Sequence, residues 1–210
     1  MSSQKIHLFW RFVSLATLGY VRTRVFTRRK EIFLTFDDGP HPLYTPQLLD
    51  LLSHHKVRAS FFLIGSECFK NARIVDRILS DGHQIGNHTA THPRMCRLST
   101  MEQWREYSSA DELLSQFVVQ PGLRFPVRPP SGKITVTSFV YCFFRLRRLV
   151  LWSRDSLDGQ LTSKEVCQKF LESPLKNGDV VLFHDDSSVC VEALSVLLPE
   201  WKRMGYKFVV

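Results

Sequence analysis

Residues 32–40 read IFLTFDDGP, an apolar, β-favouring run that ends in two carboxylates followed by glycine and proline. The run predicts a buried strand, and the Gly-Pro pair predicts a turn directly after it. Asp37 and Asp38 are therefore expected where a strand leaves the sheet. Because successive side chains of an extended chain point apart, one carboxylate can bind a metal ion while the other stays available as a base. A solvated turn is the alternative for this stretch taken alone.

Short β-rich runs alternate with helical patterns along the rest of the chain. The strand candidates are Ile32–Phe36, Ala59–Ile64, Gln84–Asn87, Arg124–Arg128, Leu149–Ser153, Val180–Phe183 and Lys207–Val210. Helices are predicted at Leu48–Leu52 after a Thr45 cap, at Ala72–Leu79 and Val191–Met204, and after capping boxes at Ser99/Glu102 and Thr162/Glu165. The alternation predicts one α/β domain of parallel strands, as an open sheet or a barrel of fewer than about eight units.

Polar residues recur where the predicted strands end. They are Asp37, Asp38, His88, His92, Arg128, Asp155 and His184. The carboxyl ends of parallel strands form the active-site face of α/β folds. We therefore expect these groups, which are far apart in the sequence, to converge on one site.

His88 and His92 are four residues apart, so their imidazoles can face one point from a helical turn or a tight loop. With one carboxylate they make a three-ligand site that leaves positions open for water and substrate, as in hydrolytic zinc sites. The pair alone is a weak signal, because unrelated surface or core histidines share the spacing.

Two further segments suggest supporting roles. The proline-rich loop Arg124–Gly132 can hold Arg128 rigidly against a carboxylate, although a basic surface loop is the alternative. His184 directly follows an apolar strand, and a neighbouring acid would bring its pKa near neutrality, where a general acid works best. Asp155 and Asp158 both offer that acid, and Asp155 is favoured because it lies nearer the strand end.

Together these segments resemble the five motifs of the NodB-homology polysaccharide deacetylases, carbohydrate esterase family 4. The resemblance is greatest in Leu34–Tyr44, Ala59–Gly65 and Gly82–Pro93, and it extends from about Glu31 to the C-terminus. Five motifs in this order are far more specific than any one of them. The resemblance implies a distorted (β/α) barrel of about seven parallel strands.

The resemblance also implies a metal-dependent hydrolase that removes N-acetyl groups from N-acetylglucosamine-type carbohydrate. One divalent ion, with Zn²⁺ favoured over other divalent transition metals, would be bound by Asp38, His88 and His92. Asp37 would be the general base that takes a proton from the attacking water. His184 would protonate the leaving amine.

The remaining implied roles concern support and substrate binding. Arg128 would orient the base, and Asp155 would support the acid. Pro129, Ser131 and Leu182 would contact substrate, with a backbone N–H near Ser131 facing the oxyanion and Leu182 lining the acetyl pocket. The family often has aromatic residues at two positions that here are Ser131 and Gly159, which predicts a wider sugar subsite.

The net charge of +8 is concentrated at the N-terminus. Residues 1–30 contain seven of the 28 basic residues and none of the 20 acidic ones, so the rest of the chain is nearly neutral. A nearly neutral domain does not predict a nucleic-acid partner. Five scattered cysteines without a Cys-x-x-Cys pair are interpreted as buried thiols, which favours a reducing compartment.

Residues 1–30 are expected to form a basic, apolar arm, and residues 31–210 the catalytic domain. The apolar segment Leu8–Val21 is too short to span a bilayer, and most of the charge follows it, unlike in a secretory signal. A helix at the membrane interface and a helix packed on the domain or on a second copy are both open. The expected location is the cytoplasm or the cytoplasmic membrane face, and the oligomeric state stays open.

Two alternative functions are retained. The arm suggests deacylation of a lipid-linked or nucleotide-linked sugar at the membrane face. An inactive carbohydrate-binding homologue would lack a metal ligand or the base, but both are present in the sequence.

Overall fold

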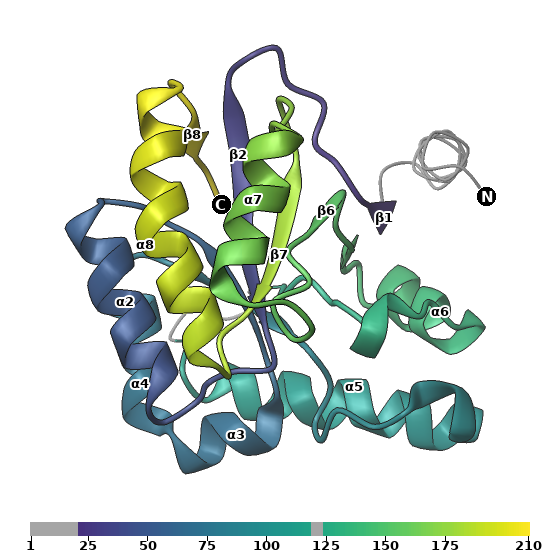
Figure 1. Ribbon diagram of the computed structural model, residues 1–210. Helices are drawn as coiled ribbons and strands as arrows, with labels where there is room; N and C mark the ends of the chain where they lie inside the picture. The colour runs from purple at the N-terminus through teal and green to yellow at the C-terminus, as the bar shows by residue number, and fades with distance from the viewer. Residues whose placement is uncertain (1–20, 119–123) are drawn as a thin grey trace.

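The computed structural model describes residues 21–118 and 124–210 as alternating strands and helices (Figure 1). The strands are β1 (Val21–Arg22), β2 (Glu31–Asp37), β3 (Ser60–Leu63), β4 (Gln84–Asn87), β5 (Leu149–Val150), β6 (Arg154–Asp155), β7 (Val180–His184) and β8 (Lys207–Phe208). The helices are α2 (Tyr44–His54), α3 (Gly65–Lys70), α4 (Ala72–Ser80), α5 (Thr100–Ser115), α6 (Val136–Phe144), α7 (Ser163–Glu172) and α8 (Ser188–Arg203). Short 3₁₀ turns form at Met95–Arg97 and Pro130–Gly132.

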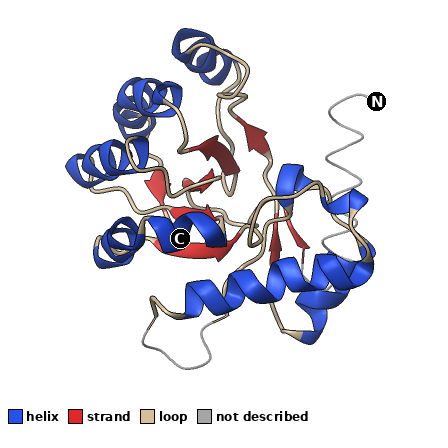
Figure 2. Ribbon diagram, turned by 90° about the horizontal axis from the view of Figure 1, so that it is seen from below, coloured by secondary structure: helices blue, strands red, loops and turns tan. Residues whose placement is uncertain are grey.

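The main sheet has β2 at its centre. The strand order is β4-β3-β2-β7-β6, with β8 paired to the start of β2, and all of these pairs are parallel. Single parallel bridges from Val127 to Asn87 and to Leu149 extend this order to β5, which pairs with β1. The strands lie inside a layer of helices (Figure 2). The predicted α/β fold with parallel strands is confirmed. Within the described ranges, paired strands do not close a complete ring.

Alternation along β2 decides which side chains face the helices. Ile32, Leu34 and Phe36 are fully buried in the large core shared with α2, α7 and α8. Phe33 and Thr35 have the opposite parity and line the interior between the strands. Asp37 continues this inward-facing set, so the strand itself directs the carboxylate into the domain.

A smaller core lies between the strands and helices α5 and α6. It contains Tyr107 and Tyr141, whose rings stack 5.2 Å apart, together with Val127 and Leu149. Val21 belongs to the same cluster. This second core fixes the β5 side of the domain, which supplies backbone carbonyls to the site described below.

The expected boundary at residue 31 is wrong for the residues that the structure describes. Val21 and Arg22 pair with β5, the Val25 N–H donates to the Gly178 carbonyl, and Arg24 forms an ion pair with Asp179. The segment before β2 is therefore part of the folded domain. Such long-range pairing cannot be inferred from charge composition. The predicted helix Leu8–Val21 lies outside the described residues, except for Val21.

Three smaller expectations are also corrected. The predicted strand Arg124–Arg128 is reduced to the bridges at Val127, because prolines flank that residue and cannot donate to a ladder. Thr45 lies inside α2 rather than capping it. All five cysteines are free, but Cys96 is exposed and Cys167 is only half-buried, so three of the five are buried as expected. No helix in the described ranges has the length and apolar character needed to cross a bilayer.

Candidate active site

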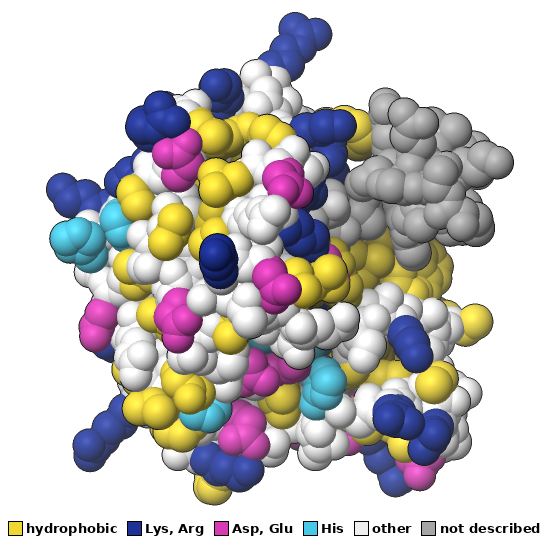
Figure 3. All heavy atoms as spheres, viewed as in Figure 1, with side chains coloured by type: hydrophobic (Ala, Val, Ile, Leu, Met, Phe, Trp, Pro, Cys, Tyr) yellow, Lys and Arg dark blue, Asp and Glu magenta, His cyan; other side chains and the backbone are white. Residues whose placement is uncertain are grey.

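The polar residues predicted at the strand ends do converge. Asp37, the last residue of β2, lies opposite Phe62 of β3 on one side and opposite His184 of β7 on the other. His88 directly follows β4, which is the next strand beyond β3. Acidic and histidine side chains lie beside one another in the lower half of the face in Figure 3. The arrangement brings a carboxylate pair and three imidazoles to one edge of the sheet.

The backbone leaves the strands through unusual conformations. Asp38, Thr89 and His92 have φ values of 73°, 71° and 55°, in the left-handed region that residues other than glycine rarely adopt. A side chain at Gly39 would meet the Asp185 carboxylate at 2.3 Å, so only glycine fits there. Strained backbone of this kind is concentrated at functional sites, where neighbouring structure holds it in place.

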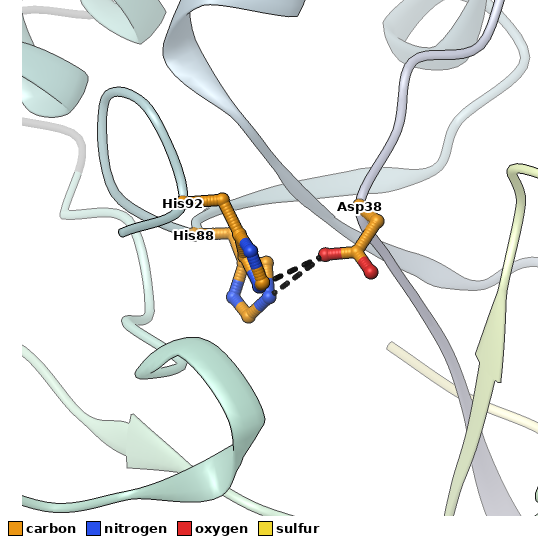
Figure 4. Close-up of side chains that lie close together, drawn as sticks. All are labelled: Asp38, His88 and His92. Carbon is orange, nitrogen blue, oxygen red and sulfur yellow. Dashed lines mark ion pairs between the residues drawn. The ribbon is translucent and has the colours of Figure 1, made fainter. Parts of the chain in front are cut away.

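Asp38, His88 and His92 form a cluster with the donor atoms of a divalent-metal site (Figure 4). Asp38 Oδ1 lies 3.3 Å from His88 Nε2 and 3.2 Å from His92 Nε2. These separations match those of ligand atoms that share one ion bound at about 2 Å. Asp38 Oδ1 is buried and has no hydrogen-bond partner among the described residues. A buried, unpartnered oxygen that faces two imidazole nitrogens fits a cation, so these residues can hold the metal.

The orientation of His88 also suits metal binding. Its Nδ1 atom lies 2.7 Å from the Arg128 carbonyl oxygen, which can only accept a hydrogen bond. Nδ1 therefore carries the proton, and in the neutral ring Nε2 presents its lone pair to the cluster. Burial alone would lower the pKa of His88, but Asp37 and Asp38 outweigh it and raise the pKa. The acidic neighbours thus favour a positive charge at this point.

Burial has different effects on the other two ligands. It lowers the pKa of His92. For Asp38 burial would raise the pKa, but the neighbouring imidazoles of His88, His92 and His184 lower it overall. Asp38 is therefore held as a carboxylate and His92 as a neutral imidazole, which are the forms that bind metals.

Asp37 lies against a buried guanidinium group. Arg128 Nη1 donates to Asp37 Oδ1 at 2.7 Å, and neither side chain is more than 4% exposed. Arg128 also donates to the Thr35 hydroxyl and to the carbonyls of Val150 and Leu151. Asp37 Oδ2 lies 3.7 Å from His88 Nε2. The guanidinium group therefore fixes one oxygen of Asp37 and leaves the other near His88, one of the three clustered residues.

The structure corrects the support predicted for His184. Asp158, not Asp155, contacts the imidazole, with its Oδ1 atom 2.8 Å from His184 Nδ1. Its Oδ2 atom also accepts the His184 backbone N–H at 2.8 Å. Burial opposes the charged imidazole, but Asp158 dominates and raises the pKa of His184 to about 9. His184 therefore carries a proton at neutral pH, as a general acid requires.

Asp155 has a local structural role instead. It lies in β6, and its Oδ1 atom accepts the Leu157 backbone N–H. Leu157 has a φ of 61°, so the chain reverses there and brings Asp158 back to the end of β7. This reversal could not be predicted from the sequence, because leucine is an uncommon residue in the left-handed region.

The three predicted substrate-binding residues lie around this site. Leu182 is buried in β7, in register with Thr35 and Asp155. Pro129 is buried and directly follows Arg128. Ser131 is exposed, with a φ of 55°. Their contacts with a carbohydrate stay a prediction.

Several positioning residues were not predicted. Asn87 is fully buried, accepts the Thr89 backbone N–H and donates to Asp111, so it fixes the start of the loop that carries both histidines. Asp185, beside His184, is fully buried and accepts the Thr45 hydroxyl at 2.5 Å, and burial raises its pKa to about 7. The sequence signal that could have identified both residues is their position directly beside a predicted site histidine.

Comparisons with known proteins agree with this site. A family model described as "Polysaccharide deacetylase" matches residues 24–141. A peptidoglycan-N-acetylglucosamine deacetylase of Bacillus cereus is 38% identical over 200 residues, covering 93% of this chain and 92% of that protein. A chitooligosaccharide deacetylase of Bradyrhizobium is 30% identical over 85% of this chain and 87% of its own length.

A solved structure extends the likeness to the fold. The crystal structure of the Bc1960 peptidoglycan N-acetylglucosamine deacetylase, in complex with 4-naphthalen-1-yl-N-oxidanyl-benzamide, superposes with a TM-score of 0.85. The two chains are 30% identical, and the match covers 93% of this chain and 92% of that one. The match therefore spans almost the whole of both chains.

Proposed function

The chain belongs to the polysaccharide deacetylase family and is a carbohydrate N-deacetylase, and from that premise we propose that it removes the acetyl groups of N-acetylglucosamine residues in peptidoglycan. The observation that carries the proposal is the complete set of reactive groups at one edge of the sheet. Three metal-binding atoms lie beside a carboxylate held by Arg128 and an imidazole held by Asp158. The Bacillus cereus relative supports peptidoglycan as the polymer.

We propose that Asp38, His88 and His92 hold a divalent ion, with Zn²⁺ the preferred candidate because carboxylate and imidazole ligands suit it. When bound, such an ion polarises a carbonyl oxygen and lowers the pKa of coordinated water. Asp38 and His92 keep 26% and 31% of their side-chain surface exposed, whereas His88 keeps 2%. Substrate and water can therefore approach from the Asp38 and His92 side.

The proton transfers are assigned to two groups. Asp37 takes a proton from the water that attacks the acetamide carbon, because Arg128 holds one of its oxygens in place and leaves the other free to accept. His184 is 28% exposed and protonated at neutral pH, so it can donate a proton to the leaving nitrogen as the C–N bond breaks. Acetate and a free amine are the products.

The shape around the site supports a polymeric or bulky substrate. A side chain added at Gly159 would meet no atom within 4 Å, so this position leaves open space. Ser131 likewise offers only a small hydroxyl. One aromatic side chain, Trp152, packs against Gly132 next to that turn. We propose that Trp152 provides the aromatic wall of a wide sugar subsite.

The membrane-associated alternative stays a prediction. Five of the seven basic residues of the N-terminal thirty lie between Arg22 and Lys30, and some of them bind the domain itself. Arg24 pairs with Asp179, and Lys30 donates to the Met204 carbonyl. These contacts give part of the basic segment a structural role. Comparing how the full chain and a variant without residues 1–20 co-sediment with vesicles would test whether residues 1–20 bind the membrane.

Acetate release tests the proposed function. Metal-loaded protein is incubated with peptidoglycan, N-acetylglucosamine oligomers and acetylated xylan, and acetate is measured enzymatically. Peptidoglycan is expected to give the highest kcat/KM, with Asp37→Asn as the inactive control. Faster acetate release from the free N-acetylglucosamine oligomers would mean that chitooligosaccharide, and not peptidoglycan, is the preferred substrate. Release from xylan alone would contradict the N-deacetylase assignment.

A further inference from the structure

A cavity lies at the opposite end of the strands from the active site. It has a volume of about 430 Å³, and its lining includes the first residue of each of three strands, Ser60 of β3, Gln84 of β4 and Val180 of β7. The reactive groups, in contrast, lie at the strand ends. Cavities of this size accommodate small organic ligands.

Three arginines from separate segments face this cavity. Arg22 comes from β1, Arg148 immediately precedes β5, and Arg124 precedes the bridge residue Val127. Because β1 pairs with β5 in parallel, Arg22 and Arg148 lie close together. Burial, followed by the charge of Arg148, lowers the pKa of Arg22, as expected for guanidinium groups that repel each other. The fold thus concentrates positive charge at one place.

No ion pair balances these charges within residues 21–118 and 124–210. The ion pairs of that part of the chain involve other arginines, including Arg24 with Asp179 and Arg128 with Asp37. Val210 also lines the cavity, but no ion pair joins it to any of the three arginines. Like charges brought together without a counter-charge destabilise the domain unless an anion binds among them.

The inner wall of the cavity separates it from the active site. Thr35 and Phe62 line the cavity, while Arg128 stacks on Phe62 at 4.0 Å and donates to the Thr35 hydroxyl. Arg128 reaches Asp37 on its other side. A ligand in the cavity would therefore not touch the catalytic groups, and the two sites can be tested separately.

We propose that this cavity binds a phosphate-bearing ligand, with Arg22, Arg124 and Arg148 around the phosphate. Guanidinium groups match phosphate oxygens with paired hydrogen bonds. A phosphate monoester carries about two negative charges at neutral pH and so balances three arginines better than a single carboxylate does. The hydroxyl of Ser60 and the amide of Gln84 offer further hydrogen bonds, and Phe33 and Val150 provide apolar walls for the rest of the ligand.

The phosphate can come from a soluble compound or from a lipid headgroup. Leu146, at the cavity, is 49% exposed, and Phe144 at the end of α6 is 72% exposed. Apolar side chains beside a basic cavity are compatible with a lipid surface. A soluble ligand would use the cavity alone. This inference does not rest on the proposed function.

Binding measurements on the full chain test the proposal. Isothermal titration calorimetry is carried out with inorganic phosphate and with dihexanoylphosphatidic acid below its micellar concentration, at constant ionic strength. The double variant Arg124→Gln/Arg148→Gln is expected to bind both compounds about tenfold or more weakly. Arg28→Gln removes one charge, as each of the single variants Arg124→Gln and Arg148→Gln does, but from an exposed position outside the cavity, and it is expected to bind like wild type.

Both altered arginines are exposed, so the double variant is expected to fold, and each single variant is measured beside it. The active site lies at the other end of the strands, so unchanged acetate release by the double variant would show that it is folded. Vesicles with and without phosphatidic acid distinguish the sources. Co-sedimentation that needs both phosphatidic acid and the arginines assigns a lipid headgroup, and phosphate binding without co-sedimentation assigns a soluble ligand. The proposal is wrong if wild type binds neither compound or if the double variant binds as tightly.

Discussion

The two ends of the parallel strands differ in how their charges are balanced. At the carboxyl ends, Asp37 is paired with Arg128 at 2.7 Å and Asp158 with His184 at 2.8 Å. At the amino ends, three arginines share one cavity without such a partner in the described residues. Paired charges hold reactive groups in a fixed orientation, whereas unpaired charges of one sign can bind a ligand of opposite charge. One end of the strands is therefore assigned to catalysis and the other to the binding of an anionic ligand.

The largest expected effect tests whether catalysis belongs to one end alone. Asp37→Asn removes the proton acceptor while keeping the side-chain volume, so kcat for acetate release is expected to fall by about 10²- to 10⁴-fold. Metal content, measured by mass spectrometry, should remain because Asp37 is not among the three clustered ligands. Arg148→Gln at the other end should leave kcat within about twofold. An equal loss of kcat in Asp37→Asn and Arg148→Gln would contradict the assignment of catalysis to one end of the strands.

A smaller effect concerns the acid. The pKa of His184 is raised above its ordinary value, so its proton is retained at neutral pH and lost as the pH rises through about 9. Activity is therefore expected to fall on the alkaline side. Asp158→Asn removes the main contact that raises this pKa, so the alkaline limb of kcat/KM should move down by about one pH unit or more.

Asp155→Asn is the matched control for that experiment. Its carboxylate accepts a backbone N–H and makes no ion pair with His184. The alkaline limb should therefore stay where it is in wild type. If Asp155→Asn shifted the limb and Asp158→Asn did not, the assignment of the supporting acid would be reversed.

A further variant, with a smaller expected effect on catalysis than Asp37→Asn, removes a charge that serves the structure. Asp111 accepts hydrogen bonds from Asn87, the Tyr141 hydroxyl and Arg147, each at 2.7–2.8 Å. Asp111→Ala would leave these donors without that acceptor and is expected to lower the free energy of unfolding by roughly 2–4 kcal/mol. Urea unfolding measures this loss. Acetate release at low temperature should fall less than tenfold, and a larger fall with unchanged stability would indicate a direct role in the reaction.

Much of the fold could be predicted because its signals are local. The capping boxes at Ser99/Glu102 and Thr162/Glu165 are both present, and each begins a helix as predicted. The strand before Asp37 shows the expected burial. Helix α6 was not predicted, since β-branched and aromatic residues dominate it and its capping box pairs Thr135 with Ser138 rather than with an acid.

The site was predictable as far as its motifs extend. The three candidate metal-binding atoms come together because two histidines four residues apart meet one strand-end aspartate. The choice between Asp155 and Asp158 as the acid that contacts His184 depended on the backbone reversal at Leu157, which the residue types there do not predict. The pairing of β1 with β5 joins residues more than a hundred positions apart, so the sequence pattern could not reveal that the basic segment belongs to the domain.

Titration of stripped protein with Zn²⁺ tests the central claim most directly, with acetate release and bound metal measured in the same samples. We predict that activity is absent in metal-free protein, rises in proportion to bound metal and reaches its plateau at a single ion per chain. His88→Ala and His92→Ala should lose both the bound ion and the activity. Acetate release by metal-free protein, or undiminished release in both variants, would contradict the assignment of this site.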